Sequence, residues 1–377
     1  MTAEAPQRRG PSSFLLGPDG WPFLLVPFIP IAIGLEVAGA GAVALFVTSA
    51  LGVIPTAALM GRATEELAAR SGPGIGGLLN VTFGNAPELI IALFALGQGL
   101  QEVVKASIVG SIIGNVLLVM GASMFVGGLG RQQQRFNATA ASAQSSMLLL
   151  ATAAVVMPAV FELVEGKGLP SPTAEIVNYG SSVEHLSLIT AFVLIGAYAA
   201  GLIFSLRTHR DLFNPQAEAE HETEPWTVRR SVGMLAIAGV AVAVMSEILV
   251  SSISETAAKA GLSEFFIGAI VVAIVGNAAE HWVAVAVARK DKMDLAVNIS
   301  IGSSAQVALF VAPALVLASY VIGDGPMALV FNGFELAALI LAALIANQVT
   351  QDGESTWFEG LQLLAVYLII AVAFFVA

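Results

Sequence analysis

The sequence Gly84-Asn85-Ala86-Pro87-Glu88 returns 192 positions later as Gly276-Asn277-Ala278-Ala279-Glu280. At the same shift, upstream and downstream matches pair Ile75-Gly76 with Ile267-Gly268 and Gly110-Ser111 with Gly302-Ser303. A further match, Phe136-Asn137 with Phe331-Asn332, needs a shift of 195. Isolated apolar identities arise by chance in an apolar chain, but a shared Gly-Asn-Ala-x-Glu followed at equal distance by Gly-Ser indicates an internal repeat.

The composition shows where such a repeat must reside. Of 377 residues, 57% are hydrophobic and 11% are charged, whereas soluble chains carry roughly 25% charged residues. This excludes a soluble enzyme and a disordered scaffold. Long unbroken apolar runs also exclude an outer-membrane barrel, whose strands alternate apolar and polar residues. We therefore expect an all-α polytopic membrane protein.

Charge and cysteine content narrow the possible partners. The net charge of −11 argues against a nucleic-acid partner. The absence of cysteine excludes disulfides, thiol chemistry and zinc–thiolate sites.

Windows of about 20 apolar residues predict transmembrane helices, because lipid leaves no other way to satisfy the backbone of a single span. Eleven spans are expected, at residues 21–37, 41–60, 73–97, 104–127, 137–157, 187–206, 231–251, 264–288, 295–321, 326–347 and 358–377.

The basic residues sort cleanly on this count. Thirteen fall on one side, which the positive-inside rule makes cytoplasmic, and three fall on the other. The three are Lys105, Lys167 and Lys259. The N-terminus is then expected in the cytoplasm and the C-terminus outside. The expected location is a prokaryotic inner (plasma) membrane. The alternative for the first span is a signal peptide cleaved after Ala38-Gly39-Ala40.

The expected domains are an N-terminal segment with the first helix (1–40), two five-helix repeats (41–208 and 229–377) and an acidic cytoplasmic linker (209–228). Because five is odd, the two repeats lie inverted in the membrane, which is a transporter architecture. The linker is either a solvated loop or a weak sensor of cytosolic cations.

Glu88 and Glu280 lie about midway along their spans, where an ionised side chain costs about 2.5–3.5 kcal/mol. No Lys or Arg is expected inside a span, since Lys105 is counted with the outside positions. Protons or a metal cation are therefore the expected neutralisers, and a buried acid at midplane is a functional site by default.

The neighbouring residues suit a cation. Gly84 and Gly276 loosen the helix and Pro87 removes a backbone donor, so each helix is expected to break and offer carbonyl oxygens. Side-chain oxygens are offered by Asn85, Asn277, Ser111 and Ser303. An all-oxygen set fits Ca²⁺ and disfavours zinc or copper. The alternative is that these small and polar residues only allow close helix packing.

Four other residues receive secondary roles. His281 points about 100° away from Glu280, so it orients a partner, joins a proton path or simply packs. Three acids lie near the outer ends of their spans and either line an access path or reach the interface: Glu36, Glu247 and Glu335.

The chain resembles the calcium/proton exchanger (CAX) family of the cation/calcium exchanger superfamily in a series of motifs. The motifs are the two Gly-Asn-Ala-x-Glu segments, the second extended to His281, and then Gly110-Ser111-Ile112-Ile113-Gly114-Asn115, Gly302-Ser303-Ser304-Ala305-Gln306 and Asp352-Gly353-Glu354-Ser355-Thr356-Trp357. The resemblance implies Ca²⁺ export against H⁺, with Glu88 and Glu280 as ion ligands and no cofactor beyond the transported ions. One departure is Ala273, where the family usually has proline.

Other functions remain open at this point. The nearest alternative is a sodium/calcium or other divalent cation exchanger, which sodium-driven flux at constant pH would reveal. A passive channel would conduct without proton coupling. An intramembrane metalloprotease requires His-Glu-x-x-His, which the sequence lacks; we therefore expect a transporter and not an enzyme, with the bilayer, Ca²⁺ and H⁺ as its partners and an unspecified oligomeric state.

Overall fold

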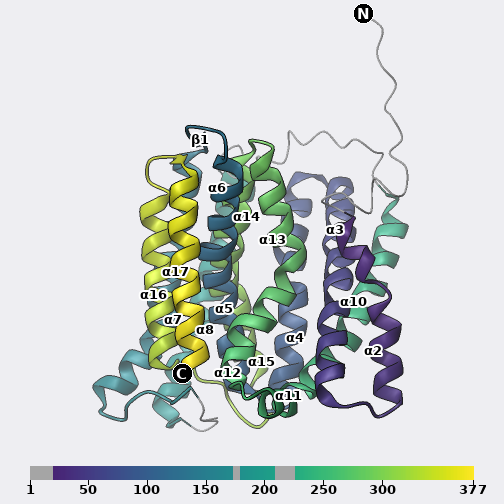
Figure 1. Cartoon of the computed structure of the whole chain (residues 1–377). Helices are drawn as coiled ribbons and strands as arrows, with labels where there is room; N and C mark the ends of the chain where they lie inside the picture. The colour runs from purple at the N-terminus through teal and green to yellow at the C-terminus, as the bar shows by residue number, and fades with distance from the viewer. Residues whose placement is uncertain (1–19, 173–178, 209–225) are drawn as a thin grey trace, which may run out of the picture.

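The computed structural model describes residues 20–172, 179–208 and 226–377, and these form a bundle of helices (Figure 1). The elements before the linker are η1 (Trp21–Leu25), α2 (Phe28–Val37), α3 (Ala42–Gly84), α4 (Ala86–Gly97), α5 (Gln101–Ile113), η2 (Gly114–Val119), α6 (Met120–Gly128), β1 (Gln134–Arg135), α7 (Ala138–Val164), α8 (Ser181–Ile203) and η3 (Phe204–Thr208). Those after it are α10 (Val228–Ser251), α11 (Ile253–Ala260), α12 (Glu264–Phe266), η5 (Ile267–Val272), α13 (Ala273–Arg289), α14 (Met293–Gln306), η6 (Val307–Val311), α15 (Ala312–Ala318), α16 (Gly333–Val349), β2 (Glu354–Ser355) and α17 (Trp357–Val376). Most of the predicted linker lies outside the described residues.

Within the described residues, eight helices are long and apolar enough to cross a membrane, or nine if one bent pair counts as a single span. That pair joins Leu78–Gly84 to Ala86–Gly97. Two shorter apolar helices cover Trp21–Val37 and Gly333–Val349. The prediction of a helical polytopic membrane protein is confirmed, whereas the expected count of eleven is not established by length and composition.

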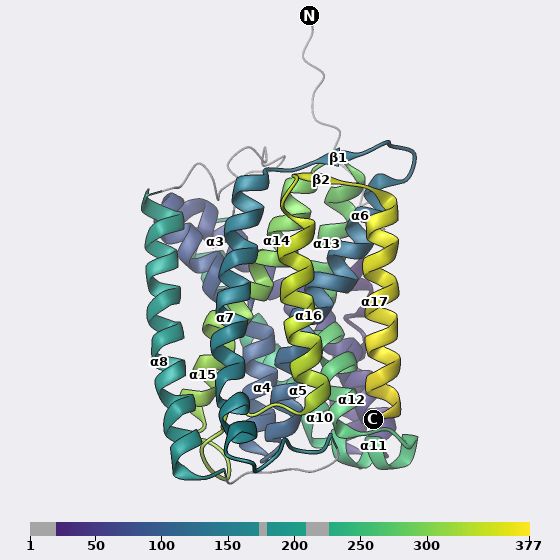
Figure 2. The same ribbon diagram turned by 90° about the vertical axis from the view of Figure 1, so that its left-hand side faces the viewer.

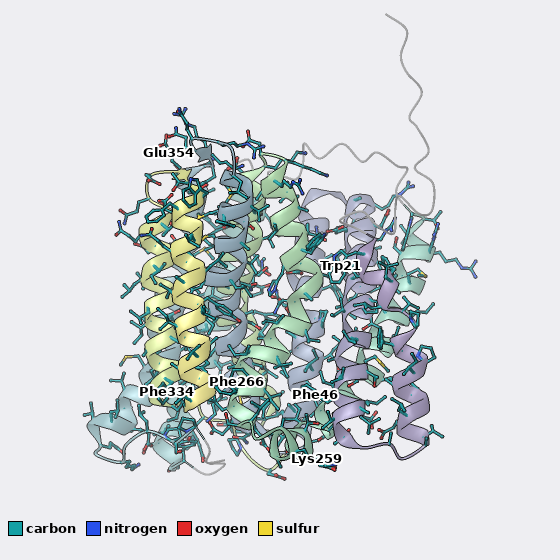
Figure 3. The ribbon with its side chains drawn as sticks, in the orientation of Figure 1. Trp21, Phe46, Lys259, Phe266, Phe334 and Glu354 are labelled. Carbon is teal, nitrogen blue, oxygen red and sulfur yellow. The ribbon has the colours of Figure 1, made fainter. Side chains whose placement is uncertain are left out.

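The helices are arranged around a core that contains α5 and the π-helices η2, η5 and η6. Helix α3 packs along α10, with α2 outside them (Figure 1). On another side, α8, α7, α16 and α17 stand in a row (Figure 2). Their outward side chains are apolar and exposed, for example Val193 (62%) and Ile369 (68%), as expected of a surface that faces lipid. Glu354 and Lys259 mark opposite ends of the bundle (Figure 3).

The sequence repeat is visible in the backbone. The π-helix η6 is the counterpart of η2 at the shift of 192, and π-bulges are frequent at functional sites. Asn137 and Asn332 both cap the N-termini of helices, α7 and α16, through their side-chain oxygens. The match of Phe136-Asn137 with Phe331-Asn332, at a shift of 195, therefore marks the start of a helix in each repeat. Near Asn137, β1 pairs antiparallel with β2.

Two expectations about the spans are wrong in detail. The predicted span 326–347 begins as a buried extended segment, and its helix starts only at Gly333, because Asn332 and Glu335 form a capping box there. Lys105 lies inside the apolar helical stretch Gln101–Gly128 and is fully buried. Its charge is tolerated because Glu102, one turn earlier, pairs with it.

Candidate functional site

Glu88 lies in the first turn of α4, directly after a break in the helix. Helix α3 ends at Gly84 and α4 starts at Ala86, with a bend of 40° between them. Pro87 suits this place because the first turn of a helix needs no backbone N–H donor from it. The break that the sequence predicts is present in the first repeat.

Glu280 lies in the middle of α13, which runs from Ala273 to Arg289 without a break at Gly276-Asn277. The second expected break is therefore wrong. Ala279 stands where the first repeat has Pro87, so the backbone N–H is retained and the helix continues. The irregularity occurs earlier instead, as the π-helix η5 that leads directly into α13.

Each glutamate side chain lies against the glycine of the other repeat's motif: Glu88 against Gly276 and Glu280 against Gly84. We call this arrangement the glutamate crossing. A β-carbon on Gly276 would lie 3.4 Å from Glu88 Cγ, and one on Gly84 would lie 3.8 Å from Glu280 Oε1. Each repeat therefore supplies the small residue against which the other repeat's carboxylate rests. Their charges act on each other across this crossing, and both side chains are only partly buried.

The two asparagine amides are held by hydrogen bonds that determine which atom faces the site. Asn85 Nδ2 donates to Gln306 Oε1 at 2.6 Å. Asn277 Nδ2 donates to Ser111 Oγ at 3.3 Å and to the Ala273 carbonyl at 3.0 Å. Because the N–H groups of Asn277 are used, its oxygen is left as the available group.

Two of these oxygens lack a hydrogen-bond donor among the described residues. They are Asn277 Oδ1 and Glu88 Oε2, and both atoms are buried. Buried acceptors are nearly always satisfied by a donor, a water or an ion. An oxygen set of carboxylates and amides suits Ca²⁺ as cargo, although no cluster of three or more His, Cys, Asp or Glu residues is assembled in the described part of the chain.

The serines and the histidine occupy the surrounding layer. Ser303 Oγ donates to Glu280 Oε2 at 3.4 Å, while Ser111 holds Asn277. His281 Nε2 lies 3.1 Å from Asn115 Oδ1, which is on η2. The histidine therefore has a hydrogen-bond partner on another helix, and its role stays a prediction.

Sequence reasoning missed three residues here. Gln306 and Asn115 were quoted only as parts of motifs, although both lie at π-helices that the repeat places in register. Glu65, on α3, is exposed, and its charge acts on Glu280. Its position gave no signal because it precedes the predicted span 73–97 and looks like a loop residue next to Glu66.

One end of the bundle is marked by residues of α3 that lie next to the linker. Glu65 is exposed on that end, and its neighbour Glu66 accepts the backbone N–H of Trp226, which directly follows residues 209–225. In the other direction along α4, Ile91, Ala95 and Leu96 are at most 3% exposed.

The three predicted access-path acids lie apart from the glutamate crossing. Glu36 and Glu247 are exposed near the ends of α2 and α10. Glu335 is fully buried and caps α16 by accepting the Asn332 backbone N–H at 2.8 Å. Among the described contacts, none joins these acids to Glu88 or Glu280.

The fold and the site define an integral membrane protein with a carboxylate pair at the junction of two repeats. The chain belongs to the sodium/calcium exchanger protein family, whose profile matches residues 41–207 and 230–376. The resemblance to the calcium/proton exchangers is confirmed by the relatives that follow.

Three relatives illustrate this similarity. The Ca(2+)/H(+) antiporter of Synechocystis sp. is 44% identical over 368 residues, covering 93% of this chain and 96% of the relative. The Ca(2+)/H(+) antiporter ChaA of Bacillus subtilis is 44% identical over 358 residues, covering 92% and 98%. The solved structure of native YfkE superposes with a TM-score of 0.79 at 40% identity, covering 94% of this chain and all of that one.

Proposed function

We propose that this protein exports Ca²⁺ in exchange for H⁺, and that Glu88 and Glu280 bind either Ca²⁺ or protons. The observation that carries the proposal is the reciprocal crossing, in which each glutamate rests on the other repeat's glycine. End-to-end similarity to Ca(2+)/H(+) antiporters supports the ions.

The chemistry follows from the burial and the charge of the pair. Two bare carboxylates at the junction of the repeats repel each other and are poorly solvated, so a cation must accompany them. Ca²⁺ and protons then compete for the same oxygens. The ligand set is Glu88, Glu280 and the oxygens of Asn85 and Asn277, with Gly84 and Gly276 making room for it.

Coupling follows if the loaded site faces one side at a time. In one state the pair would face the linker end. In the other state it would face the opposite end, where incoming protons displace Ca²⁺. Ser111, Ser303 and His281 keep the ligands aligned during this exchange, and Glu36 and Glu247 add negative charge near the helix ends opposite the linker.

We also propose the topology of eleven spans, with the N-terminus in the cytoplasm, the C-terminus outside and a bacterial plasma membrane as the location. Counting the bent pair once and adding the two shorter apolar helices gives this number. Contacts support the sorting of charges: Arg131 pairs with Asp291 and donates to the Arg289 carbonyl, all on the proposed cytoplasmic side. The repeats are 41–208 and 229–377, joined by the acidic linker 209–228.

The test uses inside-out vesicles, whose lumen corresponds to the outside. An acidic lumen should drive uptake of ⁴⁵Ca²⁺, and Glu88→Gln should reduce uptake at least about 100-fold, because one of the two charges that bind the ion is removed. Glu255→Gln is the matched control, since this exposed acid pairs only with Lys259 among its described contacts. Normal uptake by Glu88→Gln would refute the assigned role.

A sodium gradient at constant pH distinguishes proton/calcium exchange from the alternative, sodium/calcium exchange. Sodium/calcium exchange would be indicated if sodium alone drove ⁴⁵Ca²⁺ uptake, because the ligand oxygens also accept Na⁺. We expect no such uptake above that seen without any gradient.

A further inference from the structure

Both helices that carry the glutamates follow an irregular segment. Helix α4 follows the break at Asn85, and α13 follows the π-helix η5. Helix kinks commonly occur at breaks and π-turns. Contacts at the far end of each helix therefore contribute to its direction, and with it to the place of Glu88 or Glu280.

The far end of α4 rests on a loop of the other repeat. A β-carbon on Gly97 would lie 3.6 Å from Ile322 Cγ2, and Gln101 Nε2 donates to the Gly325 carbonyl at 2.9 Å. Gly99 and Gly323 have positive φ values and no side chains, which permits close backbone approach. We call the contact of residues 97–101 with residues 322–325 the α4 dock.

The far end of α13 rests in the same way on a loop of the first repeat. Gln134 Nε2 donates to the Ala288 carbonyl at 2.9 Å and to Asp291 Oδ1 at 2.8 Å. Arg131 donates to the Arg289 carbonyl at 3.2 Å. We call the contact of residues 288–291 with residues 127–134 the α13 dock.

The two docks are counterparts in the inverted repeat. Among the described residues, Asp291 is the one residue other than glycine that has a positive φ, 63°. Its counterpart at the shift of 192 is Gly99, which has a φ of 77°. The receiving loops are also equivalent, since they follow α6 and α15. The same kind of contact between the repeats therefore occurs at both ends of the bundle. This symmetry indicates that the two docks have the same role.

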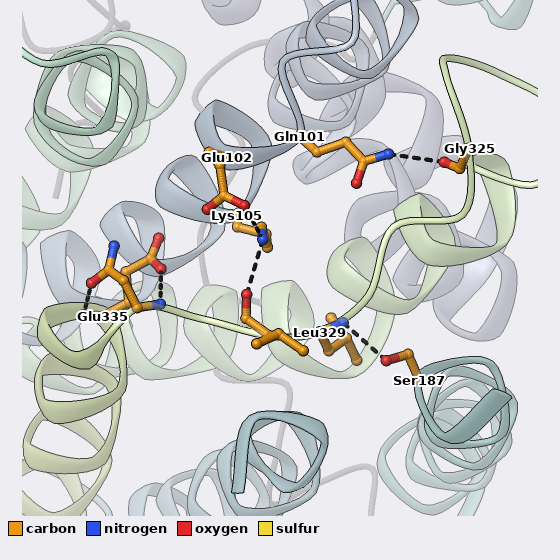
Figure 4. A network of polar contacts seen from close by, with 9 residues as sticks. Gln101, Glu102, Lys105, Ser187, Gly325, Leu329 and Glu335 are labelled. Atoms are coloured by element: carbon orange, nitrogen blue, oxygen red, sulfur yellow. Dashed lines mark hydrogen bonds and ion pairs between the residues drawn. The ribbon is translucent and has the colours of Figure 1, made fainter. Parts of the chain in front are cut away.

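The loop that receives α4 is held rigidly. From Met327 to Phe331 it is extended and at most 1% exposed. Three buried side chains satisfy its backbone. Met327 N donates to Ser319 Oγ at 2.7 Å. Leu329 N donates to Ser187 Oγ at 3.0 Å, and Lys105 Nζ donates to the Val330 carbonyl at 2.9 Å (Figure 4). Because Gln101 and Lys105 both belong to α5, this helix fastens the loop and the dock together.

We propose that the two docks are positioning devices that keep Glu88 and Glu280 at a constant separation throughout transport. Gly97 lies about 14 Å beyond Glu88 along the helix and Ala288 about 12 Å beyond Glu280, from 1.5 Å per residue. A rotation at either dock moves the carboxylate, and Ca²⁺ requires oxygens at about 2.3–2.6 Å. The docks therefore stay closed during the cycle and set the affinity for Ca²⁺. This inference rests on the proposed function.

A disulfide tests whether the α4 dock stays closed. The chain has no cysteine, so Gly97→Cys/Ile322→Cys introduces a single pair, whose formation is followed by maleimide labelling and mass. We expect the disulfide to form and the uptake of ⁴⁵Ca²⁺ to change less than about twofold on oxidation, as for a contact that need not open. Failure to cross-link, or uptake that oxidation stops and reduction restores, would overturn the proposal.

A neighbouring pair of glutamines tests the positioning role. Gln134→Ala removes both hydrogen bonds to the end of α13, whereas Gln133→Ala removes only a bond to Glu354. We expect Gln134→Ala to raise the half-saturating Ca²⁺ concentration about fivefold or more with a maximal rate within about twofold of wild type, because the ligands are misplaced rather than lost. Gln133→Ala should resemble the wild type.

The outcomes separate this inference from the proposed function. A wild-type protein without proton-driven Ca²⁺ uptake would contradict the function. Uptake by the wild type together with identical kinetics of the two glutamine variants, or a loss of maximal rate at unchanged half-saturation in Gln134→Ala, would contradict the docks alone. Melting temperatures of both variants show whether the fold is retained, and the disulfide test decides if Gln134→Ala fails to fold.

Discussion

Two carboxylates and two amides form the site at the level of residues, and the repeats supply their supports differently. Asn85 is held by a glutamine side chain, whereas Asn277 is held by a serine and a backbone carbonyl. The counterpart of Gln306 in the first repeat is Gly114, which leaves open space. The inverted repeat therefore places the ligands symmetrically but holds them by unequal means.

Gln306 is the support whose removal should be most informative. Gln306→Leu leaves the Asn85 amide without the acceptor at 2.6 Å. Losing one such bond costs about 1–1.5 kcal/mol, so we expect the half-saturating Ca²⁺ concentration to rise about tenfold. Concentration-dependent uptake measures this. Gln351→Leu, on an exposed side chain, serves as the control, and an unchanged half-saturation in Gln306→Leu would exclude the support.

At the level of elements, the chain departs from regular helix at several places. The break at Asn85, the π-helices η2, η5 and η6 and the segment before α16 all lie in or next to the core. Each needs side chains to satisfy the backbone groups that a regular helix would satisfy itself. Lys105 is the clearest case, since it is fully buried and bonds both Glu102 and the Val330 carbonyl.

Replacing Lys105 should therefore destabilise the fold strongly. Lys105→Met leaves the Glu102 carboxylate, 9% exposed, without its cation. Breaking a buried pair in this way costs about 3–5 kcal/mol. Lys259→Met breaks an exposed pair with Glu255 and should cost about 0–1 kcal/mol.

Thermal unfolding in detergent compares the two lysine variants. Adding Glu102→Leu to Lys105→Met removes the stranded charge, so the double variant should recover part of the lost stability. Equal melting temperatures for Lys105→Met and Lys259→Met would contradict the structural role of the buried pair.

At the level of the whole molecule, the fold is a helical bundle in which each repeat completes the other. Each of the two glutamates contacts a glycine of the other repeat near the centre of the bundle. The ends of α4 and α13 each contact a loop of the other repeat, at opposite faces of the bundle. The proposed ligands of each repeat are also supported by the other repeat, because Asn85 is bonded by Gln306 of α14 and Asn277 by Ser111 of α5.

The topology makes a direct prediction about the two faces. Lys259→Cys and Arg135→Cys each place one thiol in a chain without cysteine, at opposite ends of the bundle. A membrane-impermeant maleimide should label Lys259→Cys in intact cells and Arg135→Cys only after the membrane is opened, as the positive-inside rule requires. The reverse pattern would invert the proposed orientation, and equal labelling would show that one intervening span is missing.

The sequence by itself determined the class of protein, the repeat and the acidic pair. Apolar composition leaves no alternative to membrane helices, and a charged residue deep in a span is costly enough to stand out. Two details had local signals: Ala279 in place of Pro87 allows α13 to continue, and the capping box of Asn332 and Glu335 starts α16 late. Local patterns could not reveal that Lys105 is fully buried, that Gln306 lies beside Asn85 or that Gln134 lies beside Ala288. The last two contacts join residues 221 and 154 positions apart in the chain, and only tertiary packing brings such partners within hydrogen-bond distance.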